Sequence, residues 1–500
     1  MSAHGLVKSM IIIGSAQSVN ILVSLMRMKV LAILLGPTGV ALLATFNSVM
    51  STGTTLAGLG LGSSGVRQIA ASRGSGEALS RVRHVLLWAN LGQGTLAMIA
   101  LWLVRERLAL WLLDDPAYAR QIGLIGVGVL LGLIAASQTA LLRGMRRIGD
   151  LARVTVFGAV AATVAGLLAV WLQGEDGLIW FLLVQPLTAI LVAAYYTRRL
   201  PRPAAVSFTL RRIWETWRPM AGLGAVFMLG GLATAMTLLL VRTVIIQSLG
   251  LEAAGHFAAA WSITMQYVGF LLVAMAADYF PRLTEVINTP KAATALMNDQ
   301  TQIGLALGGP VLLALIGLAP WAIELLYSAE FGPAASLLQW QTLGNIFKLA
   351  SWPLSFALVA AARSRTYLFI ELSWNALFFV MIWVGLPLFG LTVTGIAFLL
   401  AYAFYFVLVN LLLHRLQGFR WERLSLALIG AHAGLGAGLF VLARLAPVAG
   451  AVAAVGLALL TGLVGARMLL RKIGPEGRLA SKLARLYQVI GWPVEKADGE

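Results

Sequence analysis

Five charged side chains stand inside segments that are otherwise apolar: Arg27, Lys29, Arg242, Lys348 and Glu371. An ionisable group in the middle of a membrane costs roughly 3 kcal/mol or more, so it normally faces a protein interior or a wet cavity. Cations outnumber acids in this set, and this excess indicates an anionic ligand. The guanidinium fork of arginine matches phosphate oxygens in particular, whereas lysine acts as a compact point charge.

Neutral polar residues extend one of these positions along a helical face. At about 100° per residue, Gln17, Asn20 and Ser24 fall with Arg27 inside an arc of about 80°, which predicts one polar stripe on an apolar helix. Lys29 lies nearly opposite Arg27. We therefore expect Lys29 to extend toward the nearby membrane surface and Arg27 to face a cavity.

A second polar stripe, Gln341, Asn345 and Lys348, has helical spacing in a later apolar segment. Packing alone does not explain a lysine there. Glu371 in the following segment has two interpretations: it forms a salt bridge with a cation such as Lys348, or it titrates as a coupling residue. Asn47 begins a run of polar and small residues that lines a cavity or lets two helices approach closely, and packing is the favoured interpretation.

Several kinds of chemistry are disfavoured. The chain has no Cys, and its five His are scattered, so neither a thiolate nucleophile nor a metal cluster is expected. Residues 60–65 read GLGSSG, but an apolar helix precedes them where a dinucleotide fold needs a strand. No GxxxxGK[ST] loop occurs. We expect no cofactor and no enzyme activity, and a possible coupling ion, H⁺ or Na⁺, is left open.

The composition explains where these residues must lie. Of the 500 residues, 59% are hydrophobic and only 11% are charged, and the mean hydropathy is +0.86. A membrane span needs about 20 mostly apolar residues in a helix. The sequence predicts an all-α membrane protein with about fourteen spans, at 7–35, 38–60, 84–104, 120–142, 151–172, 177–198, 219–249, 255–277, 300–319, 334–360, 366–386, 390–413, 425–445 and 448–469.

The distribution of Lys and Arg supports this count. If the N-terminus is cytoplasmic, 29 of the 37 Lys and Arg fall in loops on the inside and only four in outside loops. Both termini are then cytoplasmic. The net charge of +17 is spread over alternate loops without an aromatic-rich basic patch, so nucleic-acid binding is not expected.

The spans divide into two similar sets. Residues 30–36 (VLAILLG) recur as 244–250 (VIIQSLG), each glycine opening a short turn, although coincidence among apolar residues is an alternative. This pattern predicts two duplicated six-helix bundles around a central cationic cavity. The predicted organisation is a bundle at 1–200, a cytoplasmic amphipathic linker at 201–218, a bundle at 219–414, two further helices at 425–470 and a basic tail at 471–500. In the tail, a surface helix is predicted from the spacing of Leu479, Leu483, Leu486 and Ile490.

Two stretches resemble a known family. Residues 29–39 with 59–67 are similar to polysaccharide flippases of the multidrug/oligosaccharidyl-lipid/polysaccharide (MOP) exporter superfamily. Residues 325–331, 340–348 and 367–371 resemble O-antigen (Wzx-like) translocases and flippases of the lipid III type. The resemblance implies alternating access and a cargo of oligosaccharide on undecaprenyl diphosphate, an O-antigen or related repeat unit, moved to the outer leaflet of the bacterial inner membrane.

The resemblance also implies roles for residues and partners. Arg27, Arg242, Lys348 and Lys29 would bind the diphosphate, and Glu371 and the polar stripes would line the cavity or couple an ion. A polysaccharide polymerase and a chain-length protein are possible partners. Fourteen spans depart from the twelve common in O-antigen translocases, which leaves the cargo open. The alternatives are a proton- or sodium-coupled small-molecule exporter of the multidrug type and, from another class, a membrane glycan polymerase or ligase.

Overall fold

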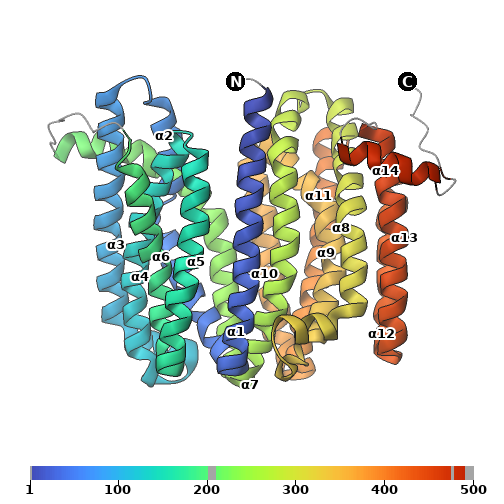
Figure 1. Cartoon of the computed structure of the whole chain (residues 1–500), viewed down its shortest axis with the longest axis horizontal. Helices are drawn as coiled ribbons and strands as arrows, with labels where there is room; N and C mark the ends of the chain where they lie inside the picture. Colours follow the sequence, from blue (N-terminus) through green and yellow to red (C-terminus); the bar gives the residue numbers. More distant parts are fainter. Residues whose placement is uncertain (1–2, 201–209, 474–477, 490–491, 493–500) are drawn as a thin grey trace. The chain divides into compact units, whose positions relative to one another are not determined.

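The computed structural model describes residues 3–200, 210–473, 478–489 and 492, and within them every regular element is a helix. Short 3₁₀ turns connect some of the long helices: η1 (Pro116–Tyr118), η2 (Gly174–Asp176), η3 (Ala329–Phe331) and η4 (Gly390–Thr392). Figure 1 shows the long helices in chain order by colour. The helices are α1 (Ala3–Gly58), α2 (Leu61–Ala71), α3 (Gly76–Leu113), α4 (Ala119–Gly144), α5 (Ile148–Gln173), α6 (Gly177–Thr197), α7 (Leu210–Val286), α8 (Pro290–Leu326), α9 (Ala334–Ala360), α10 (Ser364–Phe389), α11 (Val393–Gln417), α12 (Arg423–Leu445), α13 (Pro447–Ile473) and α14 (Arg478–Val489).

The helices are long and apolar enough to cross a membrane. Nine stretches of the described residues meet this condition. Four of the nine contain 44 to 54 residues, enough for two crossings each, and each holds two of the predicted spans. The predicted segment 84–104 lies in α3, which has 38 residues. The prediction of an all-α, multispan membrane protein is confirmed.

Two glycines interrupt the longest helices where the sequence predicts short turns. Gly36 in α1 has φ 60° and ψ −165°, and Gly250 in α7 has φ 86° and ψ 174°. Both lie in the region of positive φ that only glycine adopts readily. Near the first turn, a Cβ on Gly255 would lie 2.0 Å from the carbonyl oxygen of Pro37. The repeated glycines therefore have the same backbone role, and Gly255 lets the two turns pack together.

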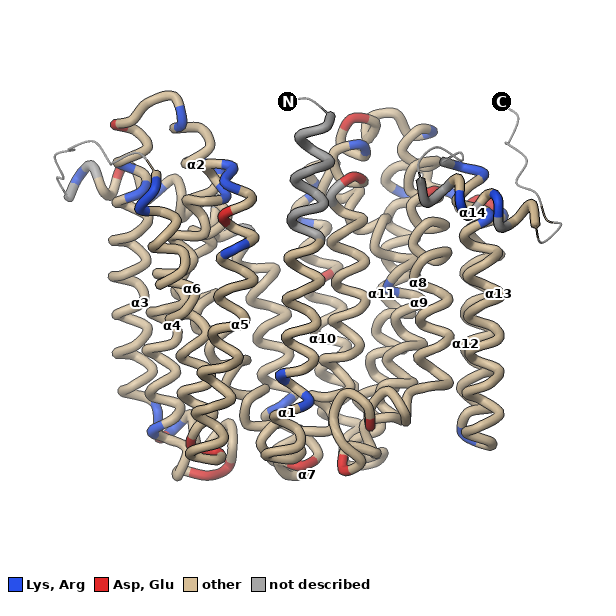
Figure 2. The backbone as a smooth tube through the Cα atoms, viewed as in Figure 1, with Lys and Arg blue, Asp and Glu red and all other residues tan. Residues whose placement is uncertain are grey.

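The chain forms two compact units. Unit 1 comprises Met1–Ala258 with Leu325–Phe331, and unit 2 comprises Ala259–Glu324 with Gly332–Glu500. In unit 1, Lys and Arg gather at the helix ends around α2 (Figure 2). The predicted domain boundaries stay a prediction, because the linker is only partly described: residues 201–209 lie outside the described residues.

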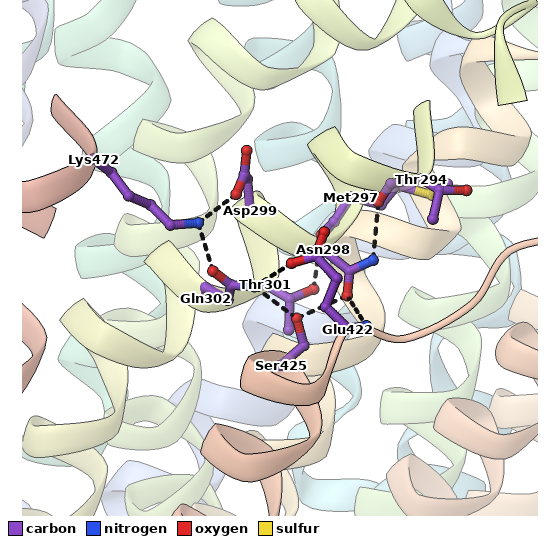
Figure 3. A network of polar contacts seen from close by, with 9 residues as sticks. All are labelled: Thr294, Met297, Asn298, Asp299, Thr301, Gln302, Glu422, Ser425 and Lys472. Carbon is purple, nitrogen blue, oxygen red and sulfur yellow. Dashed lines mark hydrogen bonds and ion pairs between the residues drawn. The ribbon is translucent and has the colours of Figure 1, made fainter. Parts of the chain in front are cut away.

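The last membrane helices of unit 2 are attached through buried polar side chains (Figure 3). The side-chain oxygen of Asn298 on α8 accepts from the backbone N–H of Glu422 at 2.9 Å and from the hydroxyl of Ser425 at 2.7 Å. Gln302, one turn further, donates to Glu422 and Ser425, while Lys472 of α13 donates to Gln302 and pairs with Asp299. We call this set the α8–α12–α13 network.

Helix α14 occupies the segment where the sequence predicts a surface helix. On α14 itself, the hydroxyl of Tyr487 donates to the carbonyl of Leu463 on α13 at 2.5 Å. Just after α14, the Trp492 ring has its centre 4.3 Å from the Arg467 guanidinium of α13. These contacts hold α14 against α13. The side chains of Leu479, Leu483, Leu486 and Ile490 lie outside the described residues, so the predicted apolar face stays a prediction.

Candidate functional site

Arg27 lies on the first leg of α1, nine residues before the break at Gly36, or about 13 Å along the helix. Its guanidinium lies 5.5 Å from the centre of the Phe181 ring on α6, and it donates a long hydrogen bond of 3.5 Å to the Ser24 hydroxyl. Its Nε is buried and has no hydrogen-bond partner in the described part of the chain, and no acid pairs with it there. Arg27 is therefore a half-buried cation with unused donors.

The remaining residues of the first stripe are less enclosed. Gln17 is exposed, whereas Asn20 and Ser24 are half-buried. Lys29 is half-buried as well. Only Ser24 of the predicted stripe contacts Arg27 through a polar group. The structure thus joins Arg27 and Ser24, and the cavity role of Gln17 and Asn20 stays a prediction.

Arg242 lies on the first leg of α7, eight residues before Gly250. Only 7% of it is exposed. Its Nη1 donates to the backbone carbonyl of Ala44 at 2.8 Å and to the hydroxyl of Ser48, both on the second leg of α1. Arg242 therefore cross-links α7 to α1, whereas its predicted contact with a diphosphate is not tested by these contacts.

Asn47 is half-buried, and its amide donates to the carbonyl of Leu43 one turn back at 2.9 Å. This hydrogen bond uses one N–H of the amide within its own helix. The role of Asn47, in packing or at a cavity, stays a prediction. Farther along the run, however, Thr54 and Gly58 line a cavity in unit 1.

Unit 2 contains a cavity of about 270 Å³, and both Lys348 and Glu371 line it. The Lys348 ammonium lies 5.1 Å from the centre of the Tyr402 ring and 3.3 Å from the sulfur of Met265. The hydroxyl of Tyr405 donates to Glu371 Oε1 at 2.8 Å. Lys348 and Glu371 form no ion pair in the described structure, so the acid is held by a tyrosine rather than by the lysine.

Aromatic rings supply much of the wall of this cavity. Trp352, Tyr367 and Trp374 line it together with Tyr402 and Tyr405. A cation over an aromatic face gains about 0.5–2 kcal/mol, which offsets part of the cost of burying an ammonium. Tyr402 and Tyr405 were not among the site residues predicted from the sequence. Their spacing of three residues on an apolar helix is the signal that could have done so.

Two predicted members of the second stripe lie outside this cavity. Gln341 is completely buried, and its side-chain oxygen accepts from the Thr264 hydroxyl at 2.9 Å. Asn345 is also completely buried, and neither of its amide atoms has a partner among the described residues. The stripe is therefore divided: Lys348 reaches the cavity, while Gln341 and Asn345 pack between helices. Helical spacing predicts which residues share one face of a helix. It does not predict how far along that face a cavity extends.

A metal site requires several ligating side chains close together. No group of three His, Asp or Glu side chains suited to a metal ion occurs among the described residues. Tyrosine hydroxyls, a carboxylate and an ammonium can exchange protons and bind polar or charged groups. The arrangement suits the binding of a polar or charged ligand.

Comparisons with known proteins agree with this arrangement. The lipid II flippase MurJ in its inward closed conformation superposes with a TM-score of 0.69 at 12% identity, covering 93% of this chain and 99% of that one. An inward-facing multidrug resistance MATE family transporter of the MOP superfamily superposes with a TM-score of 0.67 at 18% identity, covering 80% and 96%. The chain therefore has the fold of these two membrane transporters, as the sequence predicts.

The sequence comparisons are more specific. Residues 6–287 match the model of the family described as polysaccharide biosynthesis protein, and the chain belongs to that family. It is 23% identical over 387 residues to the lipid III flippase of Escherichia coli (strain K12), an alignment that covers 76% of this chain and 91% of that protein. The lipid III flippase of Shigella flexneri matches to the same extent.

Proposed function

We propose that this protein is a flippase that moves a lipid-linked oligosaccharide across the bacterial inner membrane, with undecaprenyl diphosphate as the lipid and an O-antigen or related repeat unit as the glycan. One observation carries the proposal: Arg27 has unused donors and no acidic partner in the described structure. A charge in that position is stabilised when an anionic ligand binds. The likeness to the lipid III flippases supports the same substrate class.

The chemistry of the cargo fits the side chains. A diphosphate offers several oxygens to the planar fork of an arginine, and binding it removes the need for a counterion from water. Lys348 supplies a further cation at the cavity of unit 2. The prenyl chain needs no protein groups, since it stays in the hydrocarbon of the bilayer. No bond is made or broken during translocation.

Glu371 supports a second candidate function, a proton- or sodium-coupled exporter of small molecules. The carboxyl group lines a cavity and accepts a hydrogen bond from Tyr405, and no ion pair neutralises it among the residues that the structure describes. Such a group could carry a proton in either function. In the flippase, Glu371 would couple transport to an ion, and it would not contact the lipid.

Three further assignments belong to the proposal. Both termini are cytoplasmic, as the positive-inside rule predicts. The substrate enters from the inner leaflet and leaves in the outer one by alternating access. A polysaccharide polymerase then receives the glycan.

Reconstitution into liposomes tests the proposal. Undecaprenyl-diphosphate-linked oligosaccharide should become accessible on the opposite leaflet with wild-type protein and not with Arg27→Ala. The matched control is Arg107→Ala, which removes an exposed arginine of α3. Movement that is insensitive to Arg27→Ala would contradict the role of Arg27. No movement with folded wild-type protein, combined with ion-driven drug efflux, would favour the exporter.

A further inference from the structure

Unit 1 contains a cavity of about 250 Å³ that the charged residues do not reach. It lies where the second leg of α1 ends and α2 begins. Thr54 and Gly58 of α1 and Gly62 and Ser63 of α2 line it, with Asn90 of α3 on another wall. The glycine-rich segment 60–65, whose sequence matches a dinucleotide motif without the strand that such a motif needs, thus forms part of a cavity wall.

Asn90 is the most informative residue of this cavity. Only 1% of it is exposed, and its Nδ2 donates to the Ser137 hydroxyl at 2.7 Å. Its Oδ1 is buried and has no hydrogen-bond partner in the described structure. An unpaired buried acceptor costs about 1–3 kcal/mol. A ligand that donates a hydrogen bond in this cavity would recover that free energy.

The lining combines polar groups with a larger apolar surface and carries no formal charge. Beside Asn90 it offers the hydroxyls of Thr54, Thr55 and Ser63, while Leu133 and Met228 provide apolar surface. The Thr54 hydroxyl donates to the carbonyl of Met50 at 2.6 Å, so its oxygen remains available as an acceptor. Neutral acceptors beside apolar surface suit a ligand with many hydroxyl donors and apolar C–H faces, and they offer a phosphate no cation.

Two glycines at the start of α2 form different parts of the cavity wall. Gly60 has φ 66°, and a Cβ there would lie 2.1 Å from the carbonyl oxygen of Gly224, so this wall is closed by direct backbone contact. A Cβ on Gly62 would meet no atom within 4 Å. Gly62 therefore borders empty space that a larger side chain could fill without a clash.

We infer that this cavity binds a neutral sugar residue of the transported glycan, with Asn90 Oδ1 accepting a sugar hydroxyl. The inference rests on the proposed function and specifies where the glycan, as distinct from the diphosphate, is recognised. Unit 1 then contains two separate recognition elements: Arg27 for the anionic linkage and the Asn90 cavity for the sugar.

The absence of cysteine from the chain permits a direct test, because one introduced thiol is the only one that maleimide can label. Ser63→Cys places a thiol at the cavity, and Gly74→Cys places one in the exposed turn after α2. Full-length protein in nanodiscs is labelled alone, with undecaprenyl diphosphate, or with undecaprenyl diphosphate carrying one N-acetylglucosamine. The glycosylated lipid should slow labelling at position 63 about fivefold or more, and the bare lipid should not. Neither should affect position 74.

Two second-site changes separate binding from folding. Asn90→Ala, added to Ser63→Cys, should abolish the protection. Ser137→Ala removes the partner of Asn90 Nδ2 without touching the cavity lining, and it should leave the protection in place.

The inference is overturned if bare undecaprenyl diphosphate protects position 63 equally, or if the glycosylated lipid gives no protection. It is also overturned if Ser137→Ala abolishes protection as fully as Asn90→Ala does. The liposome assay is independent of this labelling. Failure of the wild-type protein to flip lipid would reject the flippase, while sugar-dependent protection would still establish the site.

Discussion

Arg27 and Arg242 occupy equivalent places in the sequence but different surroundings in unit 1. They precede the glycine breaks of α1 and α7 by nine and eight residues. Arg242 donates to a backbone carbonyl and a hydroxyl of α1, whereas Arg27 contacts an aromatic face and one distant hydroxyl. The Nε of each arginine lacks a partner in the described structure, but Arg242 is held by two short contacts through Nη1 and Arg27 only by weak ones.

The difference shows that a charge in a membrane segment can be structural or functional, and that its hydrogen-bond partners decide which. A guanidinium has five N–H donors, so the number already used limits what it can offer a ligand. We therefore expect Arg242 to position α1 and Arg27 to bind the diphosphate. Three substitutions test this division of roles.

The largest effect is expected for Arg242→Ala. The change removes two hydrogen bonds from a charged donor and leaves a cavity between α1 and α7, at a cost of about 2 kcal/mol or more. Purified protein should show a lower Tm and a reduced folded yield. Ser48→Ala, which removes one acceptor only, should cause a smaller decrease. If Arg242→Ala kept the wild-type Tm but lost lipid binding, Arg242 would be a lipid-binding residue and not a structural one.

An intermediate effect is expected for Arg27→Lys. Lysine keeps the charge but loses the bidentate fork, so affinity for undecaprenyl diphosphate should fall about tenfold, or about 1.4 kcal/mol. The Tm should stay within about 1 °C of wild type, because Arg27 makes only weak contacts within the protein. Binding by wild type, Arg27→Lys and Arg27→Ala should therefore decrease in that order. Equal binding by all three would remove Arg27 from the site.

The smallest effect is expected for Phe181→Leu. Leucine retains most of the buried apolar surface but loses the ring face over which the Arg27 guanidinium lies, a contact of about 0.5–1 kcal/mol. We expect a two- to fivefold change in affinity for undecaprenyl diphosphate. The same substitution combined with Arg27→Ala should have no further effect on binding. Additive losses in the double variant would show that Phe181 acts independently of Arg27.

The architecture was largely predictable from the sequence. Apolar segments of about 20 residues predict the helices because a helix of that length crosses the bilayer with its backbone polar groups paired within the segment. The recurrence of Gly36 and Gly250 predicts the breaks, since both need positive φ. Charged residues in apolar segments likewise identified Arg27, Lys348 and Glu371 as positions that packing alone does not explain.

The contacts at the site were not predictable in the same way. Arg242 and Ser48 are 194 residues apart, and helical periodicity says nothing about which faces meet over such a separation. Asn90 is one polar residue in an apolar segment, and its importance depends on a cavity formed with α1 and α2. Gln341 and Asn345 share the helical spacing of Lys348, but both are completely buried and neither lines the cavity at Lys348, so their role stays a prediction.

The α8–α12–α13 network has a consequence for how such a chain could lose or gain its last two membrane helices. Asn298 and Gln302 are completely buried, and their amides are satisfied by groups from α12, α13 and the segment just before α12. Deleting residues 418–500 would remove the partners that α12, α13 and the segment before α12 supply to these amides, and an unpaired polar group away from water is expensive. A viable shortened protein would need apolar residues at 298 and 302 first. The order of substitution and deletion is therefore constrained, and a descendant with fewer helices should retain apolar residues at those two positions of α8.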